Sequence, residues 1–143
     1  LGYVGCAEEL LQQCEAQDVA FDHVVLASGS AGTHAGMAVG LRASGSDLPI
    51  LGIGVNVPRA EQEEKVFELA CDTAEFVGKR GCVTREDIVA DCNYVGGGYG
   101  VPTEAMNEAE DMYGDERLHE LLKRCPACDA KTLEKYVLDD VAE

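Results

Sequence analysis

The feature that most constrains this chain is a loop of small residues between two apolar segments of different character. Residues 23–27 (HVVLA) are typical of a buried strand, because they are largely apolar and include β-branched side chains. Residues 28–33 (SGSAGT) follow directly, and residues 35–41 have the composition of a helix that can pack closely on a sheet. This order places the loop at the carboxyl end of the strand, where open α/β sheets bind ligands.

The same alternation of strands and helices extends over most of the chain. Apolar positions at helical spacing predict a helix from Tyr3 to Cys14, and residues 50–55 predict a second strand. A further helix is expected to start near Pro58, and residues 88–90 predict a third, shorter strand. These elements predict an α/β fold: a mostly parallel sheet with helices on its faces, in three layers (αβα).

The character of the sequence changes beyond about Asn107. The remaining residues are strongly acidic, and helices are expected at 116–124 and 131–141 with no strand. We therefore expect an α/β segment over residues 1–109, incomplete as a domain, followed by an acidic helical tail over residues 110–143.

Charge and cysteine content exclude several classes of function. The formal net charge is −16, which argues against nucleic acid and anionic membrane surfaces as partners. No apolar stretch approaches the roughly 20 residues of a membrane span. The chain has seven cysteines, an odd number, and most of them lie in apolar or helical contexts. This favours a reducing, cytoplasmic location. Cys125 and Cys128 form a lone C-x-x-C pair without matching histidines, so chance or a helix break is expected and no metal site is assigned. The alternative is a metal site shared between two chains.

The loop at residues 28–33 has the properties of an anion site. Small side chains let a ligand approach the backbone, and the N–H groups and dipole of the following helix favour a phosphate. The glycine spacing differs from the G-x-G-x-x-G pattern, and there is no Gly-Lys-Ser/Thr of a P-loop. The alternative is that the glycines only permit a tight turn and close packing of helix on sheet.

Residues 28–36 (SGSAGTHAG) resemble the phosphate-binding loop of pyridoxal-phosphate enzymes of the tryptophan-synthase-β fold type. Within them, the chain is most similar to the group of D-cysteine desulfhydrases and 1-aminocyclopropane-1-carboxylate deaminases. Residues 1–10, 50–55 and 97–102 resemble further segments of this group in the same order, so the resemblance spans about residues 1–109. Pyridoxal phosphate is thus the implied cofactor.

The resemblance also implies the site residues. A phosphate would be held mainly by backbone N–H groups, with hydroxyl help from Ser30 and Thr33, and the implied cofactor-binding set is Gly29, Ser30, Ala31, Gly32 and Thr33. The implied catalytic residue is Tyr99, whose phenol would face cofactor and substrate. Its alternative role is an anchoring ring in a flexible glycine-rich turn. His34 is expected to be a packed helical residue rather than an acid or base.

The implied reaction is elimination from D-cysteine, which yields pyruvate, sulfide and ammonia. Two alternatives stay open: deamination of 1-aminocyclopropane-1-carboxylate, and a non-catalytic α/β module that binds a phosphate ligand. The resemblance further implies a small amino-acid substrate and, for the full-length form, a homodimer.

One essential group is missing from this sequence. The resemblance implies a lysine that forms an imine with the cofactor, placed upstream of the segment that matches Leu1. None of the lysines here lies in a matching motif: Lys65, Lys79, Lys123, Lys131 and Lys135. We therefore expect these residues to be an internal part of a longer enzyme, and the isolated chain to be inactive.

Overall fold

The computed structural model describes residues 1–98, 101, 103–105 and 107. The chain divides into two units, Leu1–Val101 and Pro102–Glu143, and the described residues are nearly all in the first. The helices expected at 116–124 and 131–141 lie outside the described residues. The division at residues 109 and 110 therefore stays a prediction.

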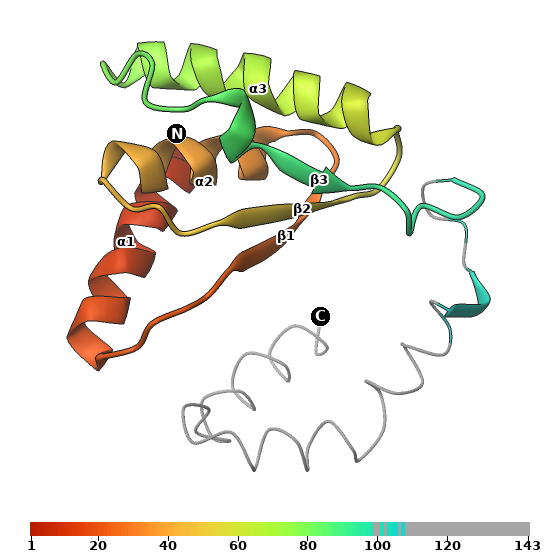
Figure 1. Ribbon diagram of the computed structural model, residues 1–143, viewed down its shortest axis with the longest axis horizontal. Coiled ribbons are helices and arrows are strands. Elements are labelled where there is room, and N and C mark those ends of the chain that lie inside the picture. Colours follow the sequence, from red (N-terminus) through yellow and green to blue (C-terminus); the bar gives the residue numbers. More distant parts are fainter. Residues whose placement is uncertain (99–100, 102, 106, 108–143) are drawn as a thin grey trace, which may run out of the picture. The chain divides into compact units, whose positions relative to one another are not determined.

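Helices and strands alternate along the first unit (Figure 1). The elements are α1 (Gly2–Gln17), β1 (Val24–Ser28), α2 (Gly32–Ala43), β2 (Ile50–Gly54), α3 (Arg59–Phe76), a short 3₁₀ helix η1 (Arg85–Asp87) and β3 (Val89–Asp91). Each predicted strand and helix of this region is present. The helix predicted from residue 35 begins earlier, at Gly32, because the loop turns directly into its first turn.

The three strands form one parallel sheet in the order β1-β2-β3. Val24 pairs with Ile50 and Ser28 with Gly54, so the carboxyl ends of β1 and β2 lie at the same level. On the far side of β2, Leu51 pairs with Val89. The predicted α/β fold with a parallel sheet is confirmed, and the loop after β1 lies at the carboxyl edge of the sheet.

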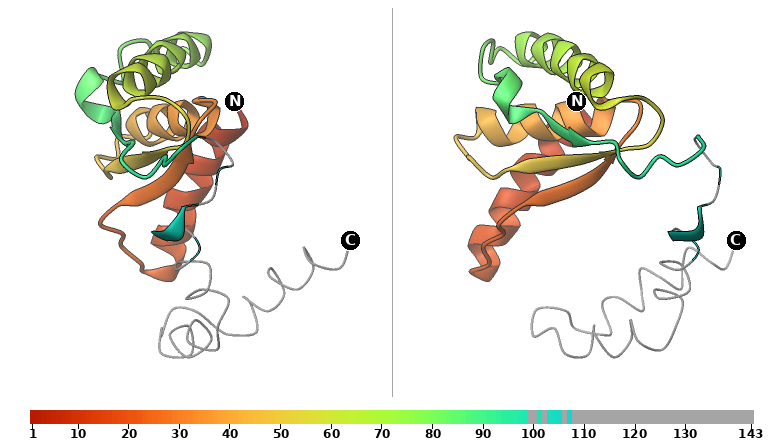
Figure 2. Two further views of the ribbon diagram at one scale, coloured as in Figure 1. Left: turned by 90° about the vertical axis from the view of Figure 1, so that its right-hand side faces the viewer. Right: turned by 45° about the vertical axis from the view of Figure 1, so that its right-hand side comes forward.

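Helices α2 and α3 pack against one face of this sheet, and α1 packs against α2 (Figure 2). Along β1 the side chains alternate: Val24 and Leu26 pack against the core, whereas Val25 is 62% exposed on the opposite face. A helical layer on that opposite face is not among the described elements. The core therefore lies between the sheet and α2, with α1 and α3 on its flanks.

The contact between α1 and α2 depends on glycines of α2. A Cβ on Gly36 would lie 2.6 Å from Cβ of Tyr3, and a Cβ on Gly40 would lie 2.6 Å from Cβ of Ala7. Both separations are far below van der Waals contact, so no larger residue fits without moving α1. The small residues noted in the sequence thus bring the two helices into backbone-level contact.

Candidate functional site

The loop between β1 and α2 has the geometry of an anion site. Ala31 precedes the first helical residue, with φ 73° and ψ −21°, in the left-handed region that costs a non-glycine residue about 1 kcal/mol. No side chain caps the start of α2. The first N–H groups of a helix have no partner within the helix, and the positive end of its dipole lies there. The start of α2 can therefore donate hydrogen bonds to an anion.

Space for a ligand lies beside this loop. A Cβ on Gly32 would meet nothing closer than Ser30 Oγ, at 4.0 Å. An open cavity of about 460 Å³ adjoins the loop at the carboxyl ends of β1 and β2. Its lining residues are Ala27, Gly29, Ser30, Val55, Asn56 and Lys65. The loop backbone is thus accessible, with the ammonium of Lys65 beside it.

Beneath the loop lies a fully buried polar cluster formed by Ser28, His34 and Gln62. Ser28 Oγ lies 3.0 Å from His34 Nδ1, and Gln62 Nε2 donates to Ser28 Oγ at 2.9 Å. Among the described residues, His34 Nε2 and Gln62 Oε1 have no hydrogen-bond partner. This cluster joins the end of β1 to both neighbouring helices.

The electrostatics of His34 agree with a packing role. Burial lowers the pKa of His34 to about 4, against a weaker opposing effect of Glu63. The imidazole is therefore neutral near pH 7. It packs so closely on β2 that a Cβ on Gly52 would lie 2.5 Å from Nδ1.

Gln62 and Lys65 both contact the loop, and neither contact was predicted from the sequence. Lys65 Nζ donates to the carbonyl oxygen of Gly29 at 2.8 Å, and Gln62 Nε2 lies 3.3 Å from the same oxygen. One signal was present: Gln62 continues the buried stripe of Val66 and Ala70 at helical spacing. A polar residue in such a stripe needs a buried hydrogen-bond partner, which the sequence alone does not identify.

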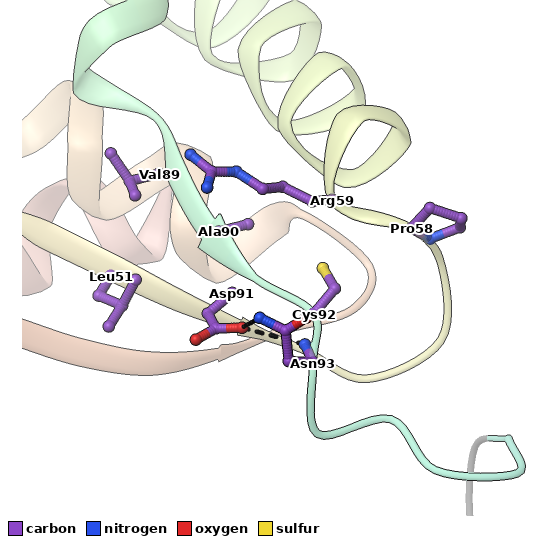
Figure 3. Close-up of a pocket in the computed structure, with 8 residues that line it drawn as sticks. All are labelled: Leu51, Pro58, Arg59, Val89, Ala90, Asp91, Cys92 and Asn93. Carbon is purple, nitrogen blue, oxygen red and sulfur yellow. Dashed lines mark hydrogen bonds between the residues drawn. The ribbon is translucent and has the colours of Figure 1, made fainter.

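A second hollow, of about 440 Å³, lies at the end of β3 (Figure 3). Asp91 Oδ1 accepts hydrogen bonds there from Asn93 N and Nδ2, at 3.0 and 2.7 Å. Cys92 lies against Gly54, and burial, followed by Asp91, raises the pKa of its thiol. The thiol is therefore protonated near neutral pH and is not an activated nucleophile.

The structure places the predicted site residues unequally. Gly29 and Ser30 line the cavity, Ala31 precedes α2, and Gly32 and Thr33 form its first turn. Tyr99 lies outside the described residues, so its role stays a prediction, as do the surroundings of Cys125 and Cys128. Within the described part of the chain, no three His, Cys, Asp or Glu side chains are grouped to hold a metal ion.

Comparison with known families gives this geometry a chemical context. A family model described as "Pyridoxal-phosphate dependent enzyme" matches residues 1–118. The chain belongs to this family. Its fold is tryptophan-synthase-β-like and its members depend on pyridoxal phosphate, so the family, fold and cofactor implied by the resemblance are confirmed.

Curated relatives cover the same part of the chain. A D-cysteine desulfhydrase of Salmonella typhi is 44% identical over 109 residues, and a 1-aminocyclopropane-1-carboxylate deaminase of Ralstonia nicotianae is 38% identical over 109 residues. Each match covers 76% of this chain and 32% of the relative. The chain therefore spans about a third of the length of these relatives.

The residues present fit the phosphate of the family's cofactor. The uncapped start of α2, the open space at Gly32 and the nearby ammonium of Lys65 together suit a dianionic group. Among the described residues, none is assigned to contact the cofactor's ring, and no lysine lies in a motif that matches the imine-forming lysine. None of the helices in the described part of the chain is long and apolar enough to cross a membrane.

Proposed function

We propose that these residues form the phosphate-binding part of an enzyme that eliminates sulfide from D-cysteine. The observation that carries the proposal is the uncapped start of α2 directly after β1, in a chain of this family. The overall reaction converts D-cysteine and water into pyruvate, hydrogen sulfide and ammonia. Pyridoxal phosphate, when bound, supplies the electron sink for loss of the α-proton and of the leaving group.

The loop residues have distinct roles in this proposal. Backbone N–H groups of residues 29–33 bind the phosphate, and the hydroxyls of Ser30 and Thr33 add hydrogen bonds. Tyr99 contacts the substrate and orients it or passes a proton to it. Ser28, His34 and Gln62 do not touch the ligand, because they lie buried beneath the loop.

A second candidate is deamination of 1-aminocyclopropane-1-carboxylate, favoured by the Ralstonia relative over the same length of chain. By resemblance to the two groups of enzymes, Thr33 followed by His34 favours the desulfhydrase. Assays with both substrates separate the two candidates. They use a protein that contains this sequence and has the length of the relatives. Release of sulfide with pyruvate from D-cysteine supports the first, and 2-oxobutanoate from the cyclopropane substrate supports the second.

The proposal extends to the organisation of the longer protein. Residues 1–109 belong to a larger cofactor-binding domain, and residues 110–143 follow it as a helical tail. The longer protein acts in the cytoplasm as a homodimer on a small amino acid. The isolated chain lacks a lysine in a matching motif, so it releases no pyruvate from D-cysteine when loaded with pyridoxal phosphate. Pyruvate release above the rate with the free cofactor would contradict this.

The phosphate role can be tested on the 143-residue chain itself. The change Gly32→Asp places a carboxylate in the open space beside the loop, where it repels an anion. Inorganic phosphate and pyridoxal phosphate are then titrated against ¹⁵N-labelled protein while the amide shifts of residues 29–33 are followed. We expect the wild type to show saturable shifts and Gly32→Asp to lose them.

The matched control is Gly5→Asp. Gly5 is an exposed helical glycine with nothing within 4 Å of an added Cβ, so the control adds the same charge to α1. An aspartate in the first turn of a helix is itself stabilising, so Gly32→Asp unfolds no more easily than the wild type. Equal phosphate binding by all three proteins would contradict the proposed site.

A further inference from the structure

Two side chains of α3 converge on one backbone oxygen at the start of the loop. The carbonyl oxygen of Gly29 accepts a hydrogen bond from Lys65 Nζ at 2.8 Å and lies 3.3 Å from Gln62 Nε2. Gln62 Nε2 also donates to Ser28 Oγ at 2.9 Å, so both hydrogens of its amide are directed at the loop. Gln62 and Lys65 are three positions apart and therefore share one face of α3.

These contacts determine the direction of the next N–H group. The carbonyl of Gly29 and the N–H of Ser30 belong to one peptide unit, and in a trans unit they point in opposite directions. The described chain has no cis peptide bond. Because the Gly29 carbonyl points toward α3, the Ser30 N–H points away from α3. The same contacts turn the negative end of the Gly29 carbonyl toward α3.

We infer that Gln62 and Lys65 are positioning residues that hold the Gly29–Ser30 peptide so that Ser30 N–H can donate to an anion. The inference rests on the proposed function, since it explains how the phosphate loop keeps its shape. Gln62 is fully buried and acts only through Ser28 and Gly29. Lys65 also lines the cavity beside the loop, and the loop itself has no basic side chain.

The first test needs no ligand. Residual dipolar couplings of the ¹⁵N-labelled 143-residue chain report the direction of each N–H bond. In Lys65→Met we expect the Ser30 coupling to change, with the couplings of β2 and the middle of α2 preserved. Gln62→Met should change the same coupling, and Lys65→Arg should retain the wild-type value because a donor remains.

The matched control is Lys79→Met, which removes the same charge from an exposed position near the end of α3. It should leave the Ser30 coupling unchanged. Lys65 is also exposed, so Lys65→Met keeps the test valid even if the buried change Gln62→Met prevents folding. A Ser30 coupling that is identical in wild type and Lys65→Met would overturn the inference.

The second test measures binding of inorganic phosphate. Lys65→Met removes the charge-assisted hydrogen bond from Lys65 Nζ to the carbonyl oxygen of Gly29. We therefore expect this variant to bind phosphate about tenfold more weakly than the wild type. Lys79→Met should bind within about twofold, which is the general effect of one remote charge. If Lys65→Met binds phosphate as tightly as the wild type does, the inference is overturned and the proposed function stands. Absence of phosphate binding by the wild type would contradict the proposed function and, with it, the donation from Ser30 N–H to an anion. A changed Ser30 coupling in Lys65→Met would then support only the orientation of the Gly29–Ser30 peptide.

Discussion

The two ends of one glycine-rich segment serve opposite purposes. Gly36 and Gly40 lie where α2 meets α1, and an added Cβ there would collide with α1 at 2.6 Å. Gly32, at the start of the same helix, would place a Cβ in open space with its nearest neighbour at 4.0 Å. The residues look alike in the sequence. The packing around each residue differs. Gly36 and Gly40 are needed for the contact with α1, whereas the position of Gly32 is accessible to a ligand.

The largest expected effect is at Gly40, where α2 packs against α1. Gly40→Ala forces a methyl group against Ala7 Cβ and the backbone oxygen of Val4, both 2.6 Å from its position. Overpacking of this kind lowers the free energy of unfolding by about 3 kcal/mol. Urea denaturation measures the change, and the control Gly5→Ala is an exposed position where a methyl group meets nothing. A Gly40→Ala chain as stable as the wild type would show that α1 moves freely away from α2.

The next effect concerns the buried side of α2, where His34 lies. Its folded pKa of about 4 is below the unfolded value of 6.5, so the unfolded chain binds the extra proton as pH falls. Stability is therefore fully present above pH 6.5 and decreases toward pH 4. The loss between pH 7 and pH 5 is about 2 kcal/mol.

Variants assign this pH dependence to one residue. His34→Gln should remove the slope between pH 5 and pH 7, whereas His23→Gln, at an exposed position, should keep it. The carboxylates act in another pH range: the pKa values of Asp87 and Glu64 are lowered, so their contributions are lost only in more acidic solution. A slope retained in His34→Gln would contradict the assignment.

A smaller effect is expected at the far end of α2. Arg42 Nε donates to Asp87 Oδ1 at 2.6 Å, and Asp87 Oδ2 accepts from Thr84 N at 2.7 Å. Both charged side chains are mostly buried, at 16% and 19% exposure, so Asp87→Asn should cost about 1–2 kcal/mol in urea denaturation. The control Glu86→Gln removes a neighbouring exposed carboxylate and should change stability by less than about 0.5 kcal/mol. Equal losses in both variants would mean that only overall charge matters here.

The smallest effect is expected at Gly32, in the open space at the start of α2. Gly32→Ala adds a methyl group that meets no close neighbour, and alanine is the better helix former. The chain should therefore be as stable as the wild type or more stable by up to about 1 kcal/mol. A destabilisation comparable to that of Gly40→Ala would abolish the distinction between the two ends of α2.

The sequence by itself determined the elements of the fold and the position of the loop. Apolar runs of strand length alternate with helical patterns, and that alternation leads to a parallel sheet because only crossover helices connect such strands compactly. It also places the loop at the carboxyl end of β1. The family resemblance came from the loop and from the ordered segments around it.

Only the tertiary structure decided which residues support that loop. Ser28 and Gln62 are 34 positions apart, and Gly29 and Lys65 are 36 apart, so their hydrogen bonds exist only because the first turns of α3 lie beside the end of β1 and the loop. The left-handed conformation of Ala31 is likewise invisible in the sequence, since alanine disfavours it and the surrounding packing must impose it. Local propensity and periodicity act over a few residues. The direction of one N–H group depends on contacts between elements distant along the chain.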